Sequence, residues 1–347
     1  MKTVNEFLHD LCFTFPKYSV TADDKKTIKK IGLAQWITNR LTSGKFRRGK
    51  VFENTRVDIL NKVTLSLEKQ LPIYLIICFG GFKHFWNPSH PTVDWADFFN
   101  IRFMAEYVSP ILAVYAPGAL LEYEAEDYIL TIMNNYPAAT LGDYAKSFEK
   151  LTTFIAKSFP NNFQVHYVRA VSQYNTSLLL NRLPSEVDKK LGAWKEKLLQ
   201  DEKLFRKVSR EIMWKGEKDL TQLSEKERKN YIIRSKAINE IFLQIDYEFR
   251  EKYFVGENHI PLVLSWGTSE SNVDHQLTLA STYTSTVDFW IGRGILEDRG
   301  QEFVPRIVSQ DQYISIKSKL KVEKSNLLPL KNFETIEIYP GTLNFVV

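Results

Sequence analysis

The apolar run from Leu71 to Phe79 constrains the fold more than any other stretch of this sequence. Large aliphatic and aromatic side chains occupy both alternating positions, which is typical of a strand buried on both faces in a parallel sheet. The run stops at Gly80 and Gly81, and after a polar loop a helix is predicted to begin with Asp94 as its N-cap. A strand, a glycine turn and a helix in this order predict an open α/β sheet with a ligand site at the end of the strand.

Most of the other predicted elements fit the same plan. Helical periodicity is present in residues 3–15, 22–42 and 54–69, so residues 1–70 are predicted to form an N-terminal helical segment packed on the core. Residues 110–115 are a second short apolar run. Further strands are predicted at 119–123, 163–168, 260–266 and 276–280, and further helices at 94–108 and 141–159.

The second half of the chain adds a charged section and another group of strands. Residues 185–251 combine dense charge of both signs with helical periodicity, which is typical of solvated helical faces. Residues 312–322 and 333–339 alternate apolar and polar side chains, which predicts antiparallel strands. We therefore expect an α/β fold with a Rossmann-like central sheet flanked by helices, in which residues 71–347 form the catalytic core.

Charge and hydropathy narrow the class of protein. The net charge of +5 over 347 residues suits a small anionic ligand and is weak evidence for nucleic acid, which needs a concentrated basic patch. No apolar run approaches the ~18 residues of a membrane span, and the N-terminus lacks the pattern of a signal peptide. We expect a soluble cytoplasmic protein that acts on small molecules, without nucleic-acid or membrane partners. Whether it forms a homo-oligomer is left open.

Motifs for metals, nucleotide cofactors and serine nucleophiles are absent from the sequence. The two cysteines lack CxxC spacing, and no two of the six histidines have HxxxH spacing. The chain contains no GxGxxG fingerprint, no P-loop and no Gly-x-Ser-x-Gly. We therefore predict no metal site and no cofactor, and a standard α/β-hydrolase is disfavoured.

Lys83 is the leading candidate for a functional residue. It follows the glycine pair, so it is expected near the end of the strand, where a lysine can bind phosphate, act as a base or form an imine. The alternative is an exposed lysine in a turn. His84 and His275 are the candidate proton carriers, although a single histidine beside aromatic residues is more often structural.

Arg293 is the second candidate because it stands between Gly292 and Gly294. The glycines would let the backbone approach a ligand, and a guanidinium binds phosphate through two hydrogen bonds. The alternative is an ordinary exposed arginine in a glycine turn.

Several motifs occur in an order that resembles the isocyanide (isonitrile) synthase family. They are CFGGFKHFWNP at 78–88, DWADFF at 94–99, YAPGA at 115–119, EAED at 124–127, NNYPAATLGDYAKSF at 134–148 and Arg234-Ser235-Lys236-Ala237 before the strand at 260–266. The resemblance extends from about residue 70 to about residue 295.

This resemblance implies a Rossmann-like fold and a biosynthetic enzyme of secondary metabolism. The implied reaction replaces the amine of an amino acid, with an aromatic one as a candidate, by an isocyanide whose extra carbon comes from a pentulose phosphate. Lys83 corresponds to the loop lysine of the family and Asn87 to the asparagine after it. The candidate substrate-binding residues are then Gly80, Gly81, Asn87, Asp94, Asp97, Trp290 and Arg293.

The chain also differs from the family pattern, so we expect a divergent member. Phe82 replaces a proline, and the spacing from lysine to asparagine is one residue longer. Trp266 stands where the family has a histidine, and the Trp290-Ile291 pair stands where the family has a Trp-His pair. Two alternatives stay open: a different transferase that uses Asp94, Asp97 or Glu126, and a non-catalytic interaction protein that binds through residues 185–251.

Overall fold

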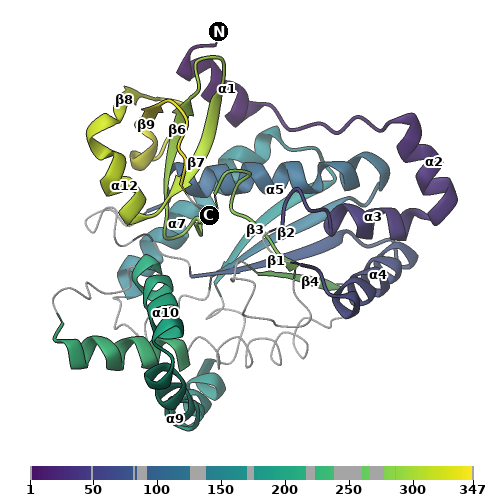
Figure 1. The fold of residues 1–347 in the computed structure, drawn as a ribbon. Coiled ribbons are helices and arrows are strands. Elements are labelled where there is room, and N and C mark those ends of the chain that lie inside the picture. The colour runs from purple at the N-terminus through teal and green to yellow at the C-terminus, as the bar shows by residue number, and fades with distance from the viewer. Residues whose placement is uncertain are drawn as a thin grey trace.

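A five-stranded parallel sheet is the central layer of the structure, a computed structural model (Figure 1). The strand order β3-β2-β1-β4-β5 is that of a Rossmann-like sheet, so the expected α/β fold is confirmed. The strands are β1 (Ile73–Phe79), β2 (Ala119–Ala125), β3 (Phe163–Arg169), β4 (Pro261–Ser265) and β5 (Leu277–Thr278). The structure describes residues 2–47, 50–80, 83, 92–125, 138–169, 176–215, 223–237, 260–265, 277–285 and 287–345.

Strand β1 is buried on both faces, as its sequence predicts. Leu75 and Ile77 point into the main core, and Tyr74 and Ile76 pack with Leu120 on the opposite face. The strand pairs with β2 on one side and β4 on the other. Its central position places the residues that follow it at the carboxyl edge of the sheet, where open α/β sheets bind ligands.

The N-terminal residues form four helices, α1 (Val4–Phe13), α2 (Ala22–Ile31), α3 (Leu33–Leu41) and α4 (Glu53–Glu68). The single helix expected at 22–42 is in fact two helices. Gly32 divides them because its φ of 84° lies in the left-handed region that glycine adopts readily. Thr21 and Asp24 form a capping box at the start of α2.

Helix α5 (Trp95–Val114) lies against both sheets of the molecule (Figure 1). It is apolar around most of its circumference, which is typical of a fully buried helix. The apolar run at 110–115 belongs almost entirely to its last turn and is not a separate element. Pro110 cannot donate to the carbonyl of Glu106, and the hydroxyl of Ser109 donates to that carbonyl instead, at 2.9 Å.

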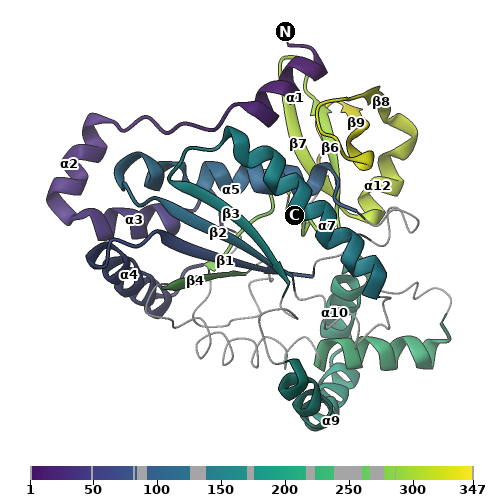
Figure 2. The same ribbon diagram turned by 180° about the vertical axis from the view of Figure 1, so that it is seen from behind.

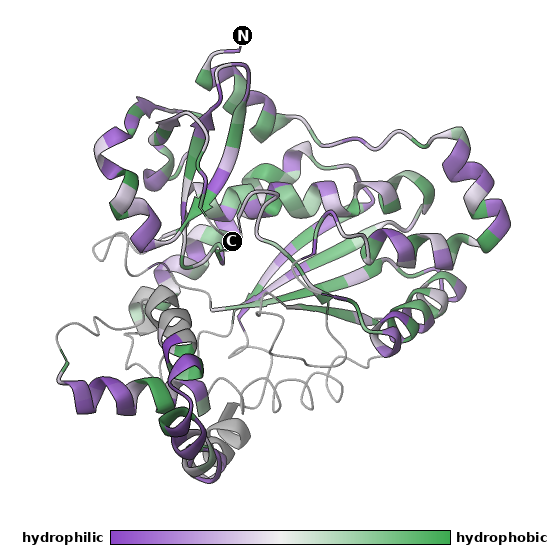
Figure 3. Cartoon of the chain, in the orientation of Figure 1, coloured by the Kyte–Doolittle hydropathy of each residue, from purple (hydrophilic) through white to green (hydrophobic). Residues whose placement is uncertain are grey.

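Helix α7 (Ala138–Ile155) continues into the short 3₁₀ helix η1 (Ala156–Ser158) and packs along β3, as Figure 2 shows from behind. Beyond the sheet, α9 (Thr176–Gln200), α10 (Glu202–Lys215) and the helical residues 225–237 share a small cluster of their own. Hydrophilic residues predominate in the coloured part of this helical group in Figure 3, whereas the strands of the central sheet are mainly hydrophobic. The described part of the charged section 185–251 is therefore helical, as expected.

The C-terminal residues form a second, four-stranded sheet of order β7-β6-β9-β8. Its strands are β6 (Arg293–Asp298), β7 (Phe303–Val308), β8 (Lys321–Lys324) and β9 (Thr335–Pro340). Two of the pairings are antiparallel, but β6 and β9 run parallel, so the sheet is mixed and not purely antiparallel as expected.

The prediction of a strand at 312–322 is wrong over most of that range. The structure places there α12 (Gln310–Ile316) and the 3₁₀ helix η3 (Lys317–Lys319) before β8 begins. Ser309 and Gln312 form a capping box, which starts the helix despite the alternating pattern.

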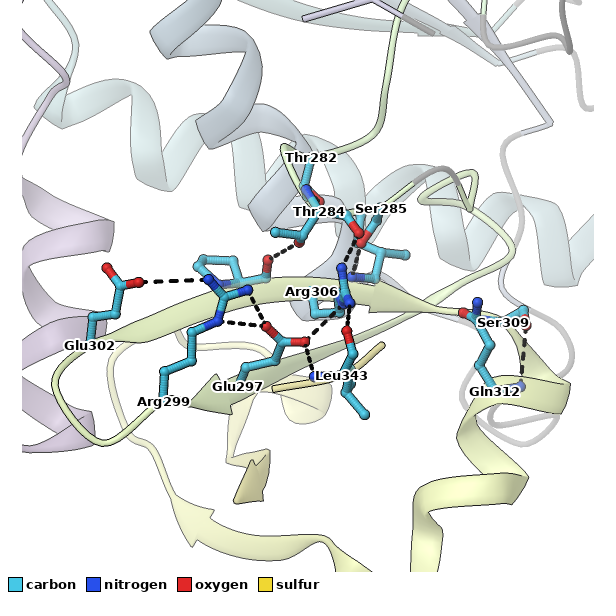
Figure 4. A network of polar contacts seen from close by, with 12 residues as sticks. Thr282, Thr284, Ser285, Glu297, Arg299, Glu302, Arg306, Ser309, Gln312 and Leu343 are labelled. Atoms are coloured by element: carbon cyan, nitrogen blue, oxygen red, sulfur yellow. Dashed lines mark hydrogen bonds and ion pairs between the residues drawn. The ribbon is translucent and has the colours of Figure 1, made fainter. Parts of the chain in front are cut away.

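A buried ion-pair network fixes the C-terminal segment to this sheet (Figure 4). Glu297, which is fully buried, contacts Arg299 at 2.7 Å and Arg306 at 3.1 Å. Its carboxylate also accepts a hydrogen bond from the backbone N–H of Leu343 at 2.9 Å.

None of the described helices of the chain is long and apolar enough to cross a membrane.

Candidate functional site

Lys83 lies just beyond the end of β1, at the carboxyl edge of the parallel sheet. Only 2% of its side chain is exposed, so it is not the exposed turn lysine that the sequence also allowed. Its Nζ atom donates to Asp94 Oδ1 at 2.8 Å and to the carbonyl oxygen of Gly292 at 2.6 Å. A second carboxylate, Asp97 Oδ2, lies 3.5 Å away.

Asp94 and Asp97 both cap the first turn of α5, and both face the lysine. Asp94 Oδ1 accepts the backbone N–H of Ala96 at 2.7 Å, and Asp97 Oδ2 accepts the backbone N–H of Asp94 at 2.8 Å. The predicted N-cap is thus confirmed, and it is part of a capping box. These carboxylates occupy the start of the helix, which in many α/β proteins binds the phosphate of a ligand.

Asp97 is fully buried, and its environment raises the pKa of its carboxyl group. Burial raises its pKa from 3.8 to about 6, and the neighbouring Asp94 adds to that rise. The charge of Lys83 lowers the pKa of Asp97. The hydroxyl of Tyr144, which donates to Asp97 Oδ1 at 2.6 Å, lowers it as well. Two carboxylates therefore share one ammonium, and the group takes up one proton in the range around pH 6.

The glycines on either side of Arg293 let other parts of the protein, and not a ligand, come close. A Cβ atom built on Gly294 would lie 2.3 Å from the backbone nitrogen of Ala96 and 2.5 Å from the carbonyl carbon of Trp95. On Gly292 it would lie 2.3 Å from a side-chain carbon of Ile307. Strand β6 can therefore pack directly on the first turn of α5, and the carbonyl of Gly292 can reach Lys83.

A cavity of about 370 Å³ opens between the start of α5, the start of β6 and the segment leading into β9. This segment includes the 3₁₀ helix η4 (Lys331–Phe333). The cavity wall carries charges of both signs, with three basic and three acidic side chains. Its lining residues are Lys83, Thr92, Asp94, Trp95, Arg293, Gly294, Lys331, Asn332, Glu334, Thr335 and Glu337.

Arg293 also lines the cavity, at the start of β6. Its Nε contacts Glu337 at 2.5 Å, and its guanidinium lies 5.0 Å from the ring centre of Tyr313. Burial lowers the pKa of Arg293, but the charge of Glu337 outweighs that effect and the pKa lies above its usual value. About a third of the side chain remains exposed, so a bound anion can still reach it.

The structure brings together four of the residues predicted from the sequence. Lys83, Asp94 and Arg293 line the cavity, and Asp97 lies directly behind Lys83. Gly80 follows the end of β1, whereas Trp290 is packed in the core with its ring 5.9 Å from that of Phe79 and does not line the cavity. Gly81, His84, Asn87, Glu126 and His275 lie outside the described residues.

Several cavity residues were not found from the sequence. Lys331, Asn332, Glu334, Thr335 and Glu337 carry no motif, and they reach the site only because β9 pairs with β6. Tyr144 lies within the motif at 134–148, but nothing in its spacing indicates contact with Asp97. Among the residues that the structure describes, no three His, Cys, Asp or Glu side chains form a group that could hold a metal ion.

The chain is similar in fold to a solved structure, whereas its sequence gives no match to the family models or curated proteins. The fold is similar to the crystal structure of the PvcA protein from Pseudomonas aeruginosa, with a TM-score of 0.60 and 15% sequence identity. The match covers 88% of this chain and 100% of that protein. Thus the chain has an overall fold similar to that of PvcA, and at this sequence identity the similarity shows the fold alone.

Proposed function

We propose that the chain is an enzyme built on an isocyanide-synthase-like scaffold, with the cavity beside Lys83 as its active site. The order of motifs between about residue 70 and about residue 295 supports this assignment. The similarity to PvcA also suggests a scaffold of this kind. The reaction would replace the amine of an amino acid, with aromatic ones as the first candidates, by an isocyanide whose carbon comes from a pentulose phosphate.

One observation carries the proposal: Lys83 and Arg293, far apart in the sequence, line the same polar cavity. Its volume of about 370 Å³ lies within the usual range for small-molecule sites. Arg293 and Lys331 supply positive charge for a phosphate or a carboxylate, and Asp94 supplies negative charge for an amine. A site with charges of both signs suits an amino acid together with a sugar phosphate.

The contacts of Lys83 favour one chemical role over another. An imine-forming lysine must lose its proton and approach a carbonyl carbon, but Lys83 is held by Asp94 and by the carbonyl of Gly292. We therefore assign it the role of a fixed ammonium at the cavity wall. The nitrogen of an isocyanide is bonded to the donated carbon, so condensation of the substrate amine with the sugar ketone, with loss of water, would make that bond. Lys83 would donate a proton to the departing hydroxyl group.

A labelling assay tests the reaction. The purified protein is incubated with single amino acids and uniformly ¹³C-labelled ribulose 5-phosphate, and mass spectrometry follows a product that has gained one labelled carbon. We expect product with the wild type and with Lys45→Met, an exposed control lysine, and none with Lys83→Met. Full activity of Lys83→Met would refute the role of the lysine.

A binding assay separates the alternatives. A ligand that binds only the folded state raises its melting temperature. Stabilisation by sugar phosphates and amino acids supports the proposal, and stabilisation by nucleotide-sugars alone favours a different transferase. If no small molecule stabilises the protein and no amino acid yields product, a non-catalytic interaction protein becomes the better interpretation.

A further inference from the structure

A line of hydrogen bonds leads from the buried surface of α7 to the wall of the cavity. The hydroxyl of Tyr144 donates to Asp97 at 2.6 Å, and Asp97 accepts the backbone N–H of Asp94 at 2.8 Å. The Nζ atom of Lys83 lies within 3.5 Å of both carboxylates. Tyr144 and Asp97 are fully buried, so neither can touch a ligand in the cavity.

Packing alone does not require the hydroxyl group of Tyr144. Its ring lies in an aromatic cluster with Phe79 and Phe148, at 6.2 Å and 5.9 Å, where a phenylalanine would fit equally well. Burial and the charge of Asp97 raise the pKa of Tyr144 well above 10, so the phenol keeps its proton and acts as a donor. A buried hydroxyl aimed at a buried carboxylate lowers the cost of keeping that carboxylate ionised.

Helix α7 is also connected to the same turn by a second contact. The backbone N–H of Val93, just before the N-cap of α5, donates to the hydroxyl of Ser147 at 3.1 Å. The Ser147 hydroxyl in turn donates to the carbonyl oxygen of Tyr144 at 2.7 Å. The start of α5 is thus held from α7 at two points, one of which is the Tyr144–Asp97 pair.

We propose that Tyr144 is a positioning residue, which acts through Asp97 to hold Lys83 in its contacts at the wall of the cavity. Its hydroxyl favours the ionised form of Asp97, and the ionised carboxylate attracts the side chain of Lys83. That Lys83 serves a reaction rests on the proposed function above. The effect of Tyr144 on the state of Lys83 does not depend on it.

Competitive chemical labelling measures that state without any substrate. Acetic anhydride acylates only the neutral amine, and isotopic mass spectrometry gives the rate at each lysine. In the wild type we expect Lys83 to react at least about 100-fold more slowly than the exposed Lys189, because its amine is buried and donates two hydrogen bonds, and hydrogen bonds to charged groups are each worth a factor of about ten or more. Tyr144→Phe is expected to raise the rate at Lys83 about tenfold, and Asp97→Asn, which removes the charge itself, by at least as much.

The matched control is Tyr107→Phe on α5. This tyrosine is also fully buried and also loses one hydrogen bond, to the carbonyl of Leu41 at 2.7 Å, but it lies outside the lysine group. It is expected to leave the rate at Lys83 unchanged. A purely structural role for Tyr144 would instead raise the rates at many lysines in proportion to the loss in melting temperature.

Two results would overturn the proposal. The first is a wild-type Lys83 that reacts as fast as Lys189, a measurement that needs no variant to fold. The second is equal labelling of Lys83 in Tyr144→Phe, Asp97→Asn and Tyr107→Phe. If the labelling follows the expected order but no isocyanide forms, the positioning role stands and the proposed reaction falls.

Discussion

The carbonyl oxygen of Gly292 accepts a hydrogen bond from Lys83 Nζ at 2.6 Å, which joins the loop after β1 to the turn before β6. The same lysine contacts both capping carboxylates of α5. One buried ammonium therefore connects the end of the parallel sheet, the start of the central helix and the start of the C-terminal sheet. The stability of this junction and the shape of the cavity depend on the same few atoms.

Replacing Lys83 with methionine should destabilise the protein in a pH-dependent way. The change leaves Asp94 and Asp97 buried without their cation, and loss of one partner of a buried ion pair costs about 3–5 kcal/mol. The loss in the free energy of unfolding should be larger at pH 8 than at pH 5, because at pH 5 Asp97 can take up a proton. Urea unfolding at the two pH values measures it. Lys45→Met, which removes an exposed ion pair with Glu106, should cost less than about 1 kcal/mol at both.

Asp97 should leave a signature in the pH dependence of stability. Its pKa is about 6 in the folded protein and 3.8 in the unfolded chain, so the folded state binds the proton more tightly between these values. Its contribution to the free energy of unfolding is therefore fully present below pH 3.8 and is lost as the pH rises through about 6. Relative to Asp97→Asn, the wild type should lose stability from pH 4 to pH 7 in urea unfolding. A constant difference between the two proteins would contradict the raised pKa.

Gly294→Ala should disrupt the contact between β6 and α5. The added methyl group would meet backbone atoms of Trp95 and Ala96, which cannot rotate away, so we expect a loss of about 3 kcal/mol in the free energy of unfolding. Gly142→Ala is the control, because it lies in α7 with open space around the added carbon. That variant should be stabilised by about 0.5–1 kcal/mol, since alanine favours a helix more than glycine does. Equal changes in the free energy of unfolding for the two variants would show that β6 does not lie this close to α5 in solution.

Glu297→Gln should weaken the C-terminal sheet far more than Glu302→Gln. The first change removes a fully buried carboxylate and leaves Arg306 without its anion, which should cost about 3 kcal/mol. Glu302 is exposed and lies 3.7 Å from Arg299, so its neutralisation should cost less than about 0.5 kcal/mol. Thermal unfolding of the two variants side by side distinguishes a structural network from a set of surface charges.

Local signals in the sequence predicted the centre of the fold and part of the site. The apolar run at 71–79 and the N-cap at Asp94 were readable because both depend on neighbouring residues. The division at Gly32 and the helix at 310–316 were missed, because a backbone torsion and a capping box overrode the periodicity. Lys331 and Glu337 could not be found, since they line the cavity beside Lys83 only when β9 pairs with β6.

Because β6 and β9 form one whole side of the cavity, Lys83 and its loop do not by themselves make a binding site. In a growing chain the lysine and its two carboxylates exist long before Gly292 and Glu337 are synthesised. The cavity would then be the last part of the molecule to be completed. A search that recognises such proteins by the glycine–lysine loop would accept chains that lack the closing sheet, and a reliable criterion must include the Gly-Arg-Gly segment and the final strand.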